Sequence, residues 1–109
     1  MTHYRSVFQP GLFKDRVALV TGGGSGIGRC AAHELAALGA AVALIGRKIE
    51  KLERVRGEIE AADGVCSTHV CDIREEDTVR ATVSAVLERH GRIDGLVNNA
   101  GGQFPSPLS

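Results

Sequence analysis

The stretch that decides the fold is VALVTGGGSGIG, residues 17–28. A short apolar run rich in valine, followed by glycines and then by a helical pattern, predicts a buried strand that turns sharply into a helix. Glycines allow backbone angles that side chains forbid, and they let a ligand come close to the main chain. The bare N–H groups and the positive end of the following helix would then face an anion. The stretch therefore predicts a loop that holds phosphate.

The loop is best described as Thr-Gly-x-x-x-Gly-x-Gly, with Thr21, Gly22, Gly26 and Gly28 at the fixed positions. The pattern G-x-G-x-x-A can also be read from Gly26 to Ala31, but the strand already ends near Thr21. A lone glycine pattern is a weak signal. A strand before it and a helix after it are the context of dinucleotide-binding sites, so we expect a pyrophosphate at this loop.

Composition limits the classes of function. The chain has 109 residues, 43% of them hydrophobic, with 13 basic and 13 acidic side chains. This predicts a single globular unit with a modest core and disfavours nucleic acid as a partner. The apolar runs are only strand-sized and the N-terminus has no secretory pattern, so we expect no membrane association and a cytoplasmic location. Three cysteines without C-x-x-C spacing are expected to be reduced structural thiols, and no metal site is expected.

Hydrophobic periodicity predicts four strands that alternate with three helices. Residues 1–14 have no period and are expected to form an N-terminal arm on the surface of the domain, which comprises residues 15–109. Gly39, Gly64 and Gly91 are expected to end the helices. The expected strands are 17–21, 41–45, 65–71 and 95–98, and the expected helices are 30–38, 48–62 and 75–90.

The order β-α-β-α-β-α-β is typical of an α/β fold whose parallel strands are joined by right-handed crossovers. It predicts the first half of a Rossmann-type, doubly wound parallel sheet with strand order 3-2-1-4. The first two helices are then expected on one face of the sheet and the third on the other. The ligand crevice is expected between the first and fourth strands, where the glycine loop meets residues 99–102.

The end of the second strand favours one nucleotide over another. An acidic residue there would accept hydrogen bonds from a ribose 2′-hydroxyl and so favour NAD. The sequence instead has Gly46 followed by Arg47 and Lys48, and a guanidinium can bind a phosphate through two hydrogen bonds. We therefore expect NADP(H) rather than NAD(H). The alternative is that Arg47 and Lys48 form only the solvated start of a helix.

Asp72 follows the third strand and has two interpretations. An aspartate at this place commonly caps the next helix, because its carboxylate accepts hydrogen bonds from free backbone N–H groups. The same place borders the adenine pocket in this topology. There the carboxylate would accept a hydrogen bond from the exocyclic amine, and Ile73 would offer its backbone.

Three motifs together resemble the short-chain dehydrogenase/reductase family: the glycine loop, Asp72 after the third strand, and Asn-Asn-Ala-Gly at residues 98–101. The resemblance covers nearly the whole chain. It implies that the glycine loop holds the pyrophosphate, that Asp72 meets adenine, and that the Asn-Asn-Ala-Gly turn steadies the sheet beside the cofactor. The predicted cofactor-binding residues are Thr21, Gly22, Gly24, Ser25, Gly26, Ile27, Gly28, Arg47, Asp72, Ile73, Asn99, Ala100 and Gly101.

A narrower likeness concerns one branch of that family. Pro-Gly-Leu at residues 10–12, Arg47-Lys48, and Gly-Gly-Gln-Phe at residues 101–104 resemble the trans-2-enoyl-CoA and 2,4-dienoyl-CoA reductases. Bacterial dehydrogenases of acyclic terpene alcohols look similar as well. The likeness implies hydride transfer to or from an enoyl-CoA, a dienoyl-CoA or a related carbonyl or alcohol, with an acyl-CoA as one candidate substrate.

The sequence departs from the family pattern at the catalytic residues. The family uses a Tyr-x-x-x-Lys pair, a Ser and an Asn from later elements, and the only tyrosine here is Tyr4, which no lysine follows at that spacing. His33, His69 and His90 have no Ser or Cys partner in the pattern and are interpreted as structural or solvated.

We therefore assign no catalytic residue and expect the catalytic half to lie beyond Ser109. In that case the 109 residues alone would show no reductase turnover and low stability, and the parent enzyme would form homo-oligomers through elements outside this sequence. The alternative is a non-catalytic module that binds nucleotide or a partner.

Overall fold

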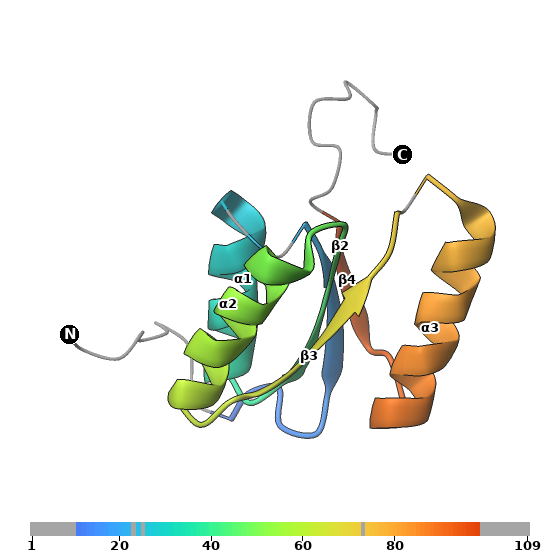
Figure 1. Ribbon diagram of the computed structural model, residues 1–109. Helices are drawn as coiled ribbons and strands as arrows, with labels where there is room; N and C mark the ends of the chain where they lie inside the picture. The colour runs from blue at the N-terminus through green and yellow to red at the C-terminus, as the bar shows by residue number, and fades with distance from the viewer. Residues whose placement is uncertain (1–10, 23, 25, 73, 99–109) are drawn as a thin grey trace, which may run out of the picture.

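A computed structural model of the chain describes residues 11–22, 24, 26–72 and 74–98. Within these residues, four strands alternate with three helices, as Figure 1 shows. The strands are β1 (Val17–Thr21), β2 (Ala41–Gly46), β3 (Val65–Val70) and β4 (Gly95–Asn98), and the helices are α1 (Gly26–Ala37), α2 (Ile49–Ala61) and α3 (Glu76–His90). The sheet is parallel and has the order β3-β2-β1-β4, which confirms the predicted fold class and topology.

Strand β1 is an inner strand of the sheet and has a parallel neighbour on each side. It pairs with β2 on one side, from Val17 opposite Ala41 to Thr21 opposite Ile45. On the other side it pairs with β4, and Thr21 there lies opposite Asn98. All five residues of β1 are buried, as expected of an apolar strand covered on both faces. The pairing places the carboxyl ends of β1, β2 and β4 at one edge of the sheet.

Helices cover the two faces of the sheet unequally. Helices α1 and α2 lie on one face and α3 lies on the other (Figure 1), as the sequence predicts. Each face has its own cluster of buried side chains, because successive residues of a strand point to opposite faces. The α1/α2 cluster comprises Val20, Ala32, Val42, Leu44, Leu52, Val55, Ile59 and Cys66, and the α3 cluster comprises Val17, Leu19, Ala43, Ile45, Cys71 and Val86.

The largest boundary error concerns α1, which begins at Gly26 rather than at Cys30. Helix propensity disfavours glycine in a helix, so the sequence places the start too late. The other bounds differ from the expected ones by one residue, except that Gly64 does not end α2 as expected. Asp63 takes the left-handed conformation there, with φ of 68°. Gly64 instead allows close packing, because an added Cβ would lie 2.6 Å from Cγ2 of Ile59.

Residues 11–16 form turns that rest against the end of α1. The backbone N–H of Phe13 donates to the carbonyl of Leu38 at 2.8 Å, and Arg16 accepts from Ala41 at 2.9 Å. The predicted surface arm is thus described only over residues 11–14, and the boundary at residue 15 stays a prediction.

The structure also bears on what the sequence predicts about the cysteines, about membrane-spanning helices and about metal sites. Cys66 and Cys71 are buried and free, and burial raises the pKa of Cys66 to about 12. Cys30 is also free but lies exposed on α1, so it does not pack in the core as the other two thiols do. Across the described residues, no helix is both long and apolar enough to cross a membrane. The same residues contain no group of three or more His, Cys, Asp or Glu side chains placed to hold a metal ion.

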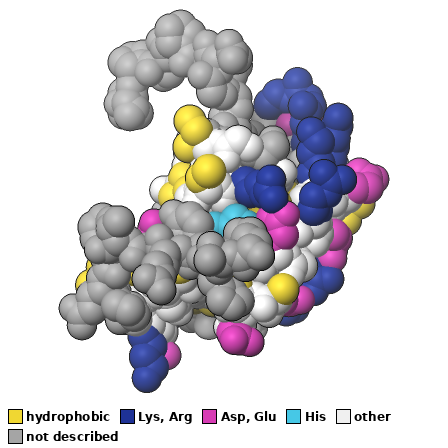
Figure 2. All heavy atoms as spheres, turned by 90° about the vertical axis from the view of Figure 1, so that its left-hand side faces the viewer, with side chains coloured by type: hydrophobic (Ala, Val, Ile, Leu, Met, Phe, Trp, Pro, Cys, Tyr) yellow, Lys and Arg dark blue, Asp and Glu magenta, His cyan; other side chains and the backbone are white. Residues whose placement is uncertain are grey.

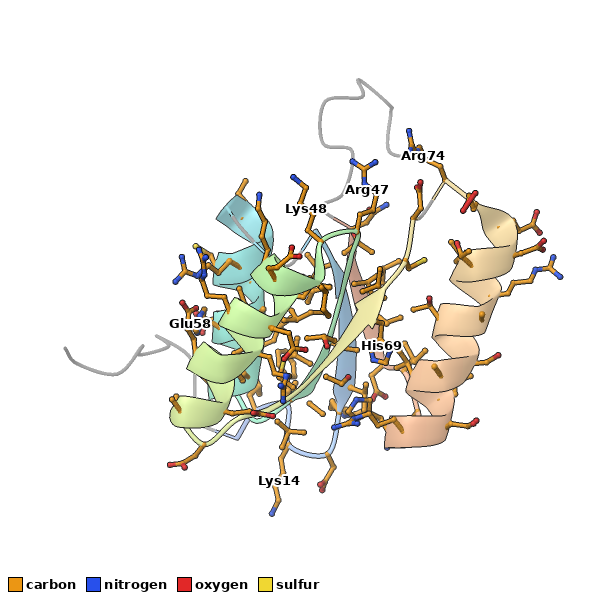
Figure 3. All side chains as sticks on the ribbon, viewed as in Figure 1. Lys14, Arg47, Lys48, Glu58, His69 and Arg74 are labelled. Atoms are coloured by element: carbon orange, nitrogen blue, oxygen red, sulfur yellow. The ribbon has the colours of Figure 1, made fainter. Side chains whose placement is uncertain are left out.

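Two histidines between β3 and α3 share one serine hydroxyl. Ser67 Oγ lies 2.9 Å from Nε2 of His69 and 2.9 Å from Nε2 of His90. Figure 3 shows His69 on the side of the sheet that faces α3. The sequence does not reveal this shared contact, because His90 lies 23 residues from Ser67 and on another element. Burial lowers the pKa of both histidines, and Arg89 adds repulsion at each of them.

We predict that this histidine pair makes the fold less stable in mild acid. An unfolded histidine takes up a proton near pH 6.5, whereas His69 and His90 in the fold do so only at lower pH. The unfolded state therefore binds more protons below about pH 7, and the free energy of unfolding falls as the pH falls. Urea titrations at about pH 7 and about pH 5.5 should show a lower midpoint at the lower pH.

The variant His69→Gln/His90→Gln is the control for this prediction. It should lose most of the pH dependence over this range, because the carboxylates with lowered pKa, such as Glu58 and Asp94, titrate at lower pH. An equal pH dependence in the variant and the wild type would contradict the assignment.

Candidate functional site

The predicted crevice lies where β1 and β4 end side by side. Thr21 closes β1, and its hydroxyl donates to Oδ1 of Asn98 at 3.0 Å while lying 3.3 Å from the carbonyl oxygen of Val97. The backbone N–H of Gly22 donates to the carbonyl of Ile45 at 2.8 Å. The first residues of the glycine loop are therefore held to both neighbouring strands.

The described part of the glycine loop has the geometry that the sequence predicts. Gly22 and Gly26 have φ of 67° and 60°, a conformation that other residues adopt at a cost. An added Cβ at Gly26 would meet nothing within 4 Å, so open space lies beside the first residue of α1. Gly28 is buried in the first turn, while Ile27 is 74% exposed. The start of α1 thus leaves room beside Gly26, and the positive end of a helix attracts anions.

Gly24 is needed for packing as well as for its place in the loop. A Cβ added there would lie 2.7 Å from Cβ of Lys51 on α2. Real Cβ atoms do not approach so closely, so a larger residue would push the loop away from α2. The sequence places Gly24 in the cofactor site but gives no sign of this contact.

Basic side chains gather at the same edge of the sheet. Arg47 and Lys48 follow β2 and are exposed, and Figure 3 shows both at the end of the molecule where the strands terminate. Figure 2 shows lysine and arginine side chains grouped at this upper edge. Arg47 therefore lies close to the ends of β1 and β2, and its contact with a phosphate stays a prediction.

Asp72 lies beside this basic group and is paired with Arg74. The backbone N–H of Cys71 donates to the carbonyl of Gly46 at 2.8 Å, which brings Asp72 next to Arg47 across the two chain segments. Nε of Arg74 donates to Oδ1 of Asp72 at 3.0 Å, and its Nη2 donates to Oδ2 at 2.8 Å. These hydrogen bonds, with a smaller effect from Arg47, hold the pKa of the Asp72 carboxyl well below its usual range.

The interpretation of Asp72 as a helix cap is wrong. The N-cap of α3 is Glu75, which makes no side-chain capping bond. The Asp72 carboxylate accepts from the backbone N–H of Arg74, two residues on and ahead of the helix, at 3.0 Å. Its carbonyl accepts from the hydroxyl of Thr78 and the N–H of Glu75, both at 3.0 Å. Asp72 therefore organises the loop before α3, and its predicted contact with adenine stays a prediction.

Five predicted site residues lie outside the described residues: Ser25, Ile73, Asn99, Ala100 and Gly101. The structure adds Asn98, which holds Thr21, and Arg74, which holds Asp72. The predicted strand order already places the ends of β1 and β4 together, so Asn98 could have been found from the sequence. Arg74 could have been found from its opposite charge two residues after Asp72.

The fold is that of an α/β protein of the doubly wound type, a class whose members bind nucleotides at this end of the sheet. The open space beside Gly26, the helix end behind it and the basic edge fit the pyrophosphate and phosphate groups of a dinucleotide. The chain belongs to the short-chain dehydrogenase family, because the sequence model described as short chain dehydrogenase matches residues 16–109.

Relatives within this family include a 2,4-dienoyl-CoA reductase and a dehydrogenase of citronellol catabolism. The chain is 36% identical over its whole length to the peroxisomal 2,4-dienoyl-CoA reductase of Danio rerio, of which it covers 37%. It is 60% identical to a solved structure from Pseudomonas aeruginosa PAO1, the citronellol catabolism dehydrogenase AtuB, with a TM-score of 0.88. That match covers 96% of this chain and 43% of the solved chain, so the 109 residues span less than half the length of these relatives.

Solved members of the family contain either nicotinamide cofactor. A metagenomic short-chain oxidoreductase in complex with NADP is 47% identical over 82% of this chain and 40% of its own, with a TM-score of 0.79. An NAD⁺-bound xylitol dehydrogenase is 39% identical over 82% of this chain and 34% of its own, also with a TM-score of 0.79. The family thus binds nicotinamide cofactors, and members similar to this chain differ in which one.

We predict that Gly26→Val abolishes nucleotide binding. The β-branched side chain would fill the open space beside the start of α1, and it would strain a backbone with φ of 60°. Fluorescence titration with NADPH measures the affinity, and circular dichroism checks that the variant folds.

Gly57→Val is the matched control. Gly57 lies within α2, has no positive φ, and would present its Cβ to open space. The control should bind as the wild type does. Normal NADPH binding by folded Gly26→Val would contradict the placement of the phosphate loop.

Proposed function

We propose that this chain is the cofactor-binding part of an NADP(H)-dependent oxidoreductase of the short-chain dehydrogenase family. The observation that carries the choice of cofactor is the end of β2, where Gly46 and Arg47 stand in place of a carboxylate. A carboxylate there would repel a 2′-phosphate, whereas a guanidinium binds it with charge-assisted hydrogen bonds. The relative that contains NADP is consistent with this proposal.

The chain's own residues would bind and orient the cofactor. The N–H groups at the start of α1 would bind the pyrophosphate, since Gly22 and Gly26 leave the main chain open to it. Asp72 would accept from adenine, and Arg47 would bind the 2′-phosphate. The bound nicotinamide supplies or accepts the hydride. The hydrogen bond between Thr21 and Asn98 holds β1 against β4. This would fix the surface on which the nicotinamide half of the cofactor would lie.

Two substrate classes are supported by the relatives. The likeness to 2,4-dienoyl-CoA reductases supports an enoyl-CoA or dienoyl-CoA substrate, at 36% identity. The higher identity of 60% to the citronellol catabolism dehydrogenase supports an acyclic terpenoid alcohol or aldehyde. The second class has the stronger support, because closely related enzymes more often share a substrate class than distant ones do.

The proton donor for hydride transfer would come from residues outside the described ones. The family's Tyr-x-x-x-Lys pair does not occur in the 109 residues, so these residues by themselves should not turn over substrate. We further propose that the enzyme is cytoplasmic and acts as a homo-oligomer. A non-catalytic nucleotide-binding module is the alternative function, and it would bind NADPH without any turnover.

The decisive experiment uses the native polypeptide, isolated from the cells that produce it. Its intact mass is measured first, and it is then assayed for NADP⁺ reduction with citronellol and for NADPH oxidation with a 2,4-dienoyl-CoA. Activity with one substrate assigns the class. NADPH binding without activity on either substrate, or on simple alcohols and aldehydes, would favour the non-catalytic module.

We predict that Arg47→Asp reverses the cofactor preference. The wild type should bind NADPH more tightly than NADH, and the variant should lose roughly 10- to 100-fold in NADPH affinity, because a charge-assisted contact becomes a repulsion. Titration of both cofactors against both proteins measures this.

Arg54→Asp on α2 is the control, since it makes the same charge change at another exposed arginine. It should leave the preference for NADPH nearly intact. Equal affinities of the wild type for the two cofactors would overturn the proposal for NADP(H).

A further inference from the structure

The edge that carries Arg47 also carries a carboxylate. The hydrogen bond from Cys71 N–H to the carbonyl of Gly46 fixes the segment before Asp72 against the segment before Arg47. Arg47 is close enough to lower the pKa of Asp72 by its charge. Any phosphate that binds Arg47 therefore also experiences the charge of Asp72.

A bare carboxylate at this place would oppose phosphate binding. A 2′-phosphate carries nearly two negative charges, and like charges close together repel one another even at a wet surface. Salt screens this repulsion only in part over a distance of less than about 10 Å. The single positive charge of Arg47 would then have to balance the negative charges of both the phosphate and Asp72.

Arg74 neutralises this carboxylate in a fixed geometry. Its Nε and Nη2 donate separately to the two oxygens of Asp72, at 3.0 and 2.8 Å, and its own backbone N–H donates to Oδ1 at 3.0 Å. Two parallel hydrogen bonds of this kind are the strongest arrangement of an arginine and a carboxylate. Figure 3 shows Arg74 and Arg47 at the same end of the molecule.

We propose that Arg74 is a positioning residue for cofactor choice: by pairing with Asp72 it removes the negative charge beside Arg47, so that this edge accepts a 2′-phosphate. The proposal rests on the proposed use of NADP(H). Arg74 acts through Asp72 and does not itself contact the phosphate. NADH has no 2′-phosphate, so its binding does not depend on this neutralisation.

The test measures the dissociation constants of NADPH and NADH for the wild type and for Arg74→Gln, using the polypeptide as its cells produce it. Arg74→Gln should weaken NADPH binding by about three- to tenfold, the size of a screened surface repulsion, and leave NADH binding nearly unchanged. The difference in NADPH affinity between the wild type and Arg74→Gln should shrink as the salt concentration rises. Arg80→Gln is the matched control, because it breaks an exposed arginine–carboxylate pair, with Glu76, on the same side of the sheet. It should change neither constant.

A rescue experiment distinguishes the proposed role of Arg74 from direct binding of the phosphate and from a purely structural role. Asp72→Asn in the Arg74→Gln background removes the exposed charge and should restore the ratio of the two constants, even where the loss of an adenine contact weakens both cofactors equally. Rescue by Arg74→Lys without rescue by Asp72→Asn would mean that residue 74 binds the phosphate directly, and it would overturn the proposal. A parallel loss of NADPH and NADH affinity in Arg74→Gln would show a purely structural role and would overturn it too.

The Arg47→Asp titration distinguishes a failure of this inference from a failure of the proposed function. If the wild type prefers NADPH and Arg47→Asp loses that preference while Arg74→Gln keeps it, only the role of Arg74 fails. If the wild type binds both cofactors equally, the use of NADP(H) fails, and the role of Arg74 fails with it.

Discussion

The parallel pairing of β1 with a strand on each side is the constraint on which the rest of the structure depends. It fixes Thr21 between Ile45 and Asn98, so the glycine loop leaves the sheet at a defined point. Because all the strands run the same way, the segments that follow β1, β2 and β4 emerge at one edge. The loop, Arg47 and the Thr21–Asn98 contact are therefore parts of one site, although 76 residues separate Gly22 from Asn98 in the sequence.

The sequence predicts this architecture well because its signals are local and repeat along the chain. Apolar strands alternate with helices, and α1 and α3 end shortly before Gly39 and Gly91, which both have the positive φ typical of residues that follow a helix. The start of α1 at Gly26 could not be predicted from propensity, since tertiary contacts and the loop geometry decide it. The Ser67–His69–His90 cluster also escaped prediction, because it depends on how α3 docks against β3.

The two faces of the sheet differ in how completely the described residues cover them. The α1/α2 face has a core in which Val20, Val42, Leu44 and Val55 are fully buried. On the α3 face, Leu96 of β4 is 61% exposed and borders a hollow of about 280 Å³ between the sheet and α3. Each square ångström of apolar surface left in water forgoes about 25 cal/mol of stabilisation, so the first face contributes more to stability. The glycine loop lies on this better packed side, where Gly24 approaches Lys51 of α2 closely.

The cofactor choice proposed for this edge depends on where the charges are paired rather than on their sum. Basic and acidic side chains balance over the whole chain, so net charge favours neither NADPH nor NADH. Glu58 is paired with Arg29 and His33, and Asp94 is paired with Arg92 and Arg16 at the amino ends of β1 and β4, opposite to the carboxyl ends where Arg47 lies. Asp72 is the carboxylate that lies beside Arg47, and its pairing with Arg74 leaves the charge of Arg47 less opposed. In the proposed role, this local ion pair leaves the positive charge of Arg47 available to a phosphate, although the chain as a whole is electrically neutral.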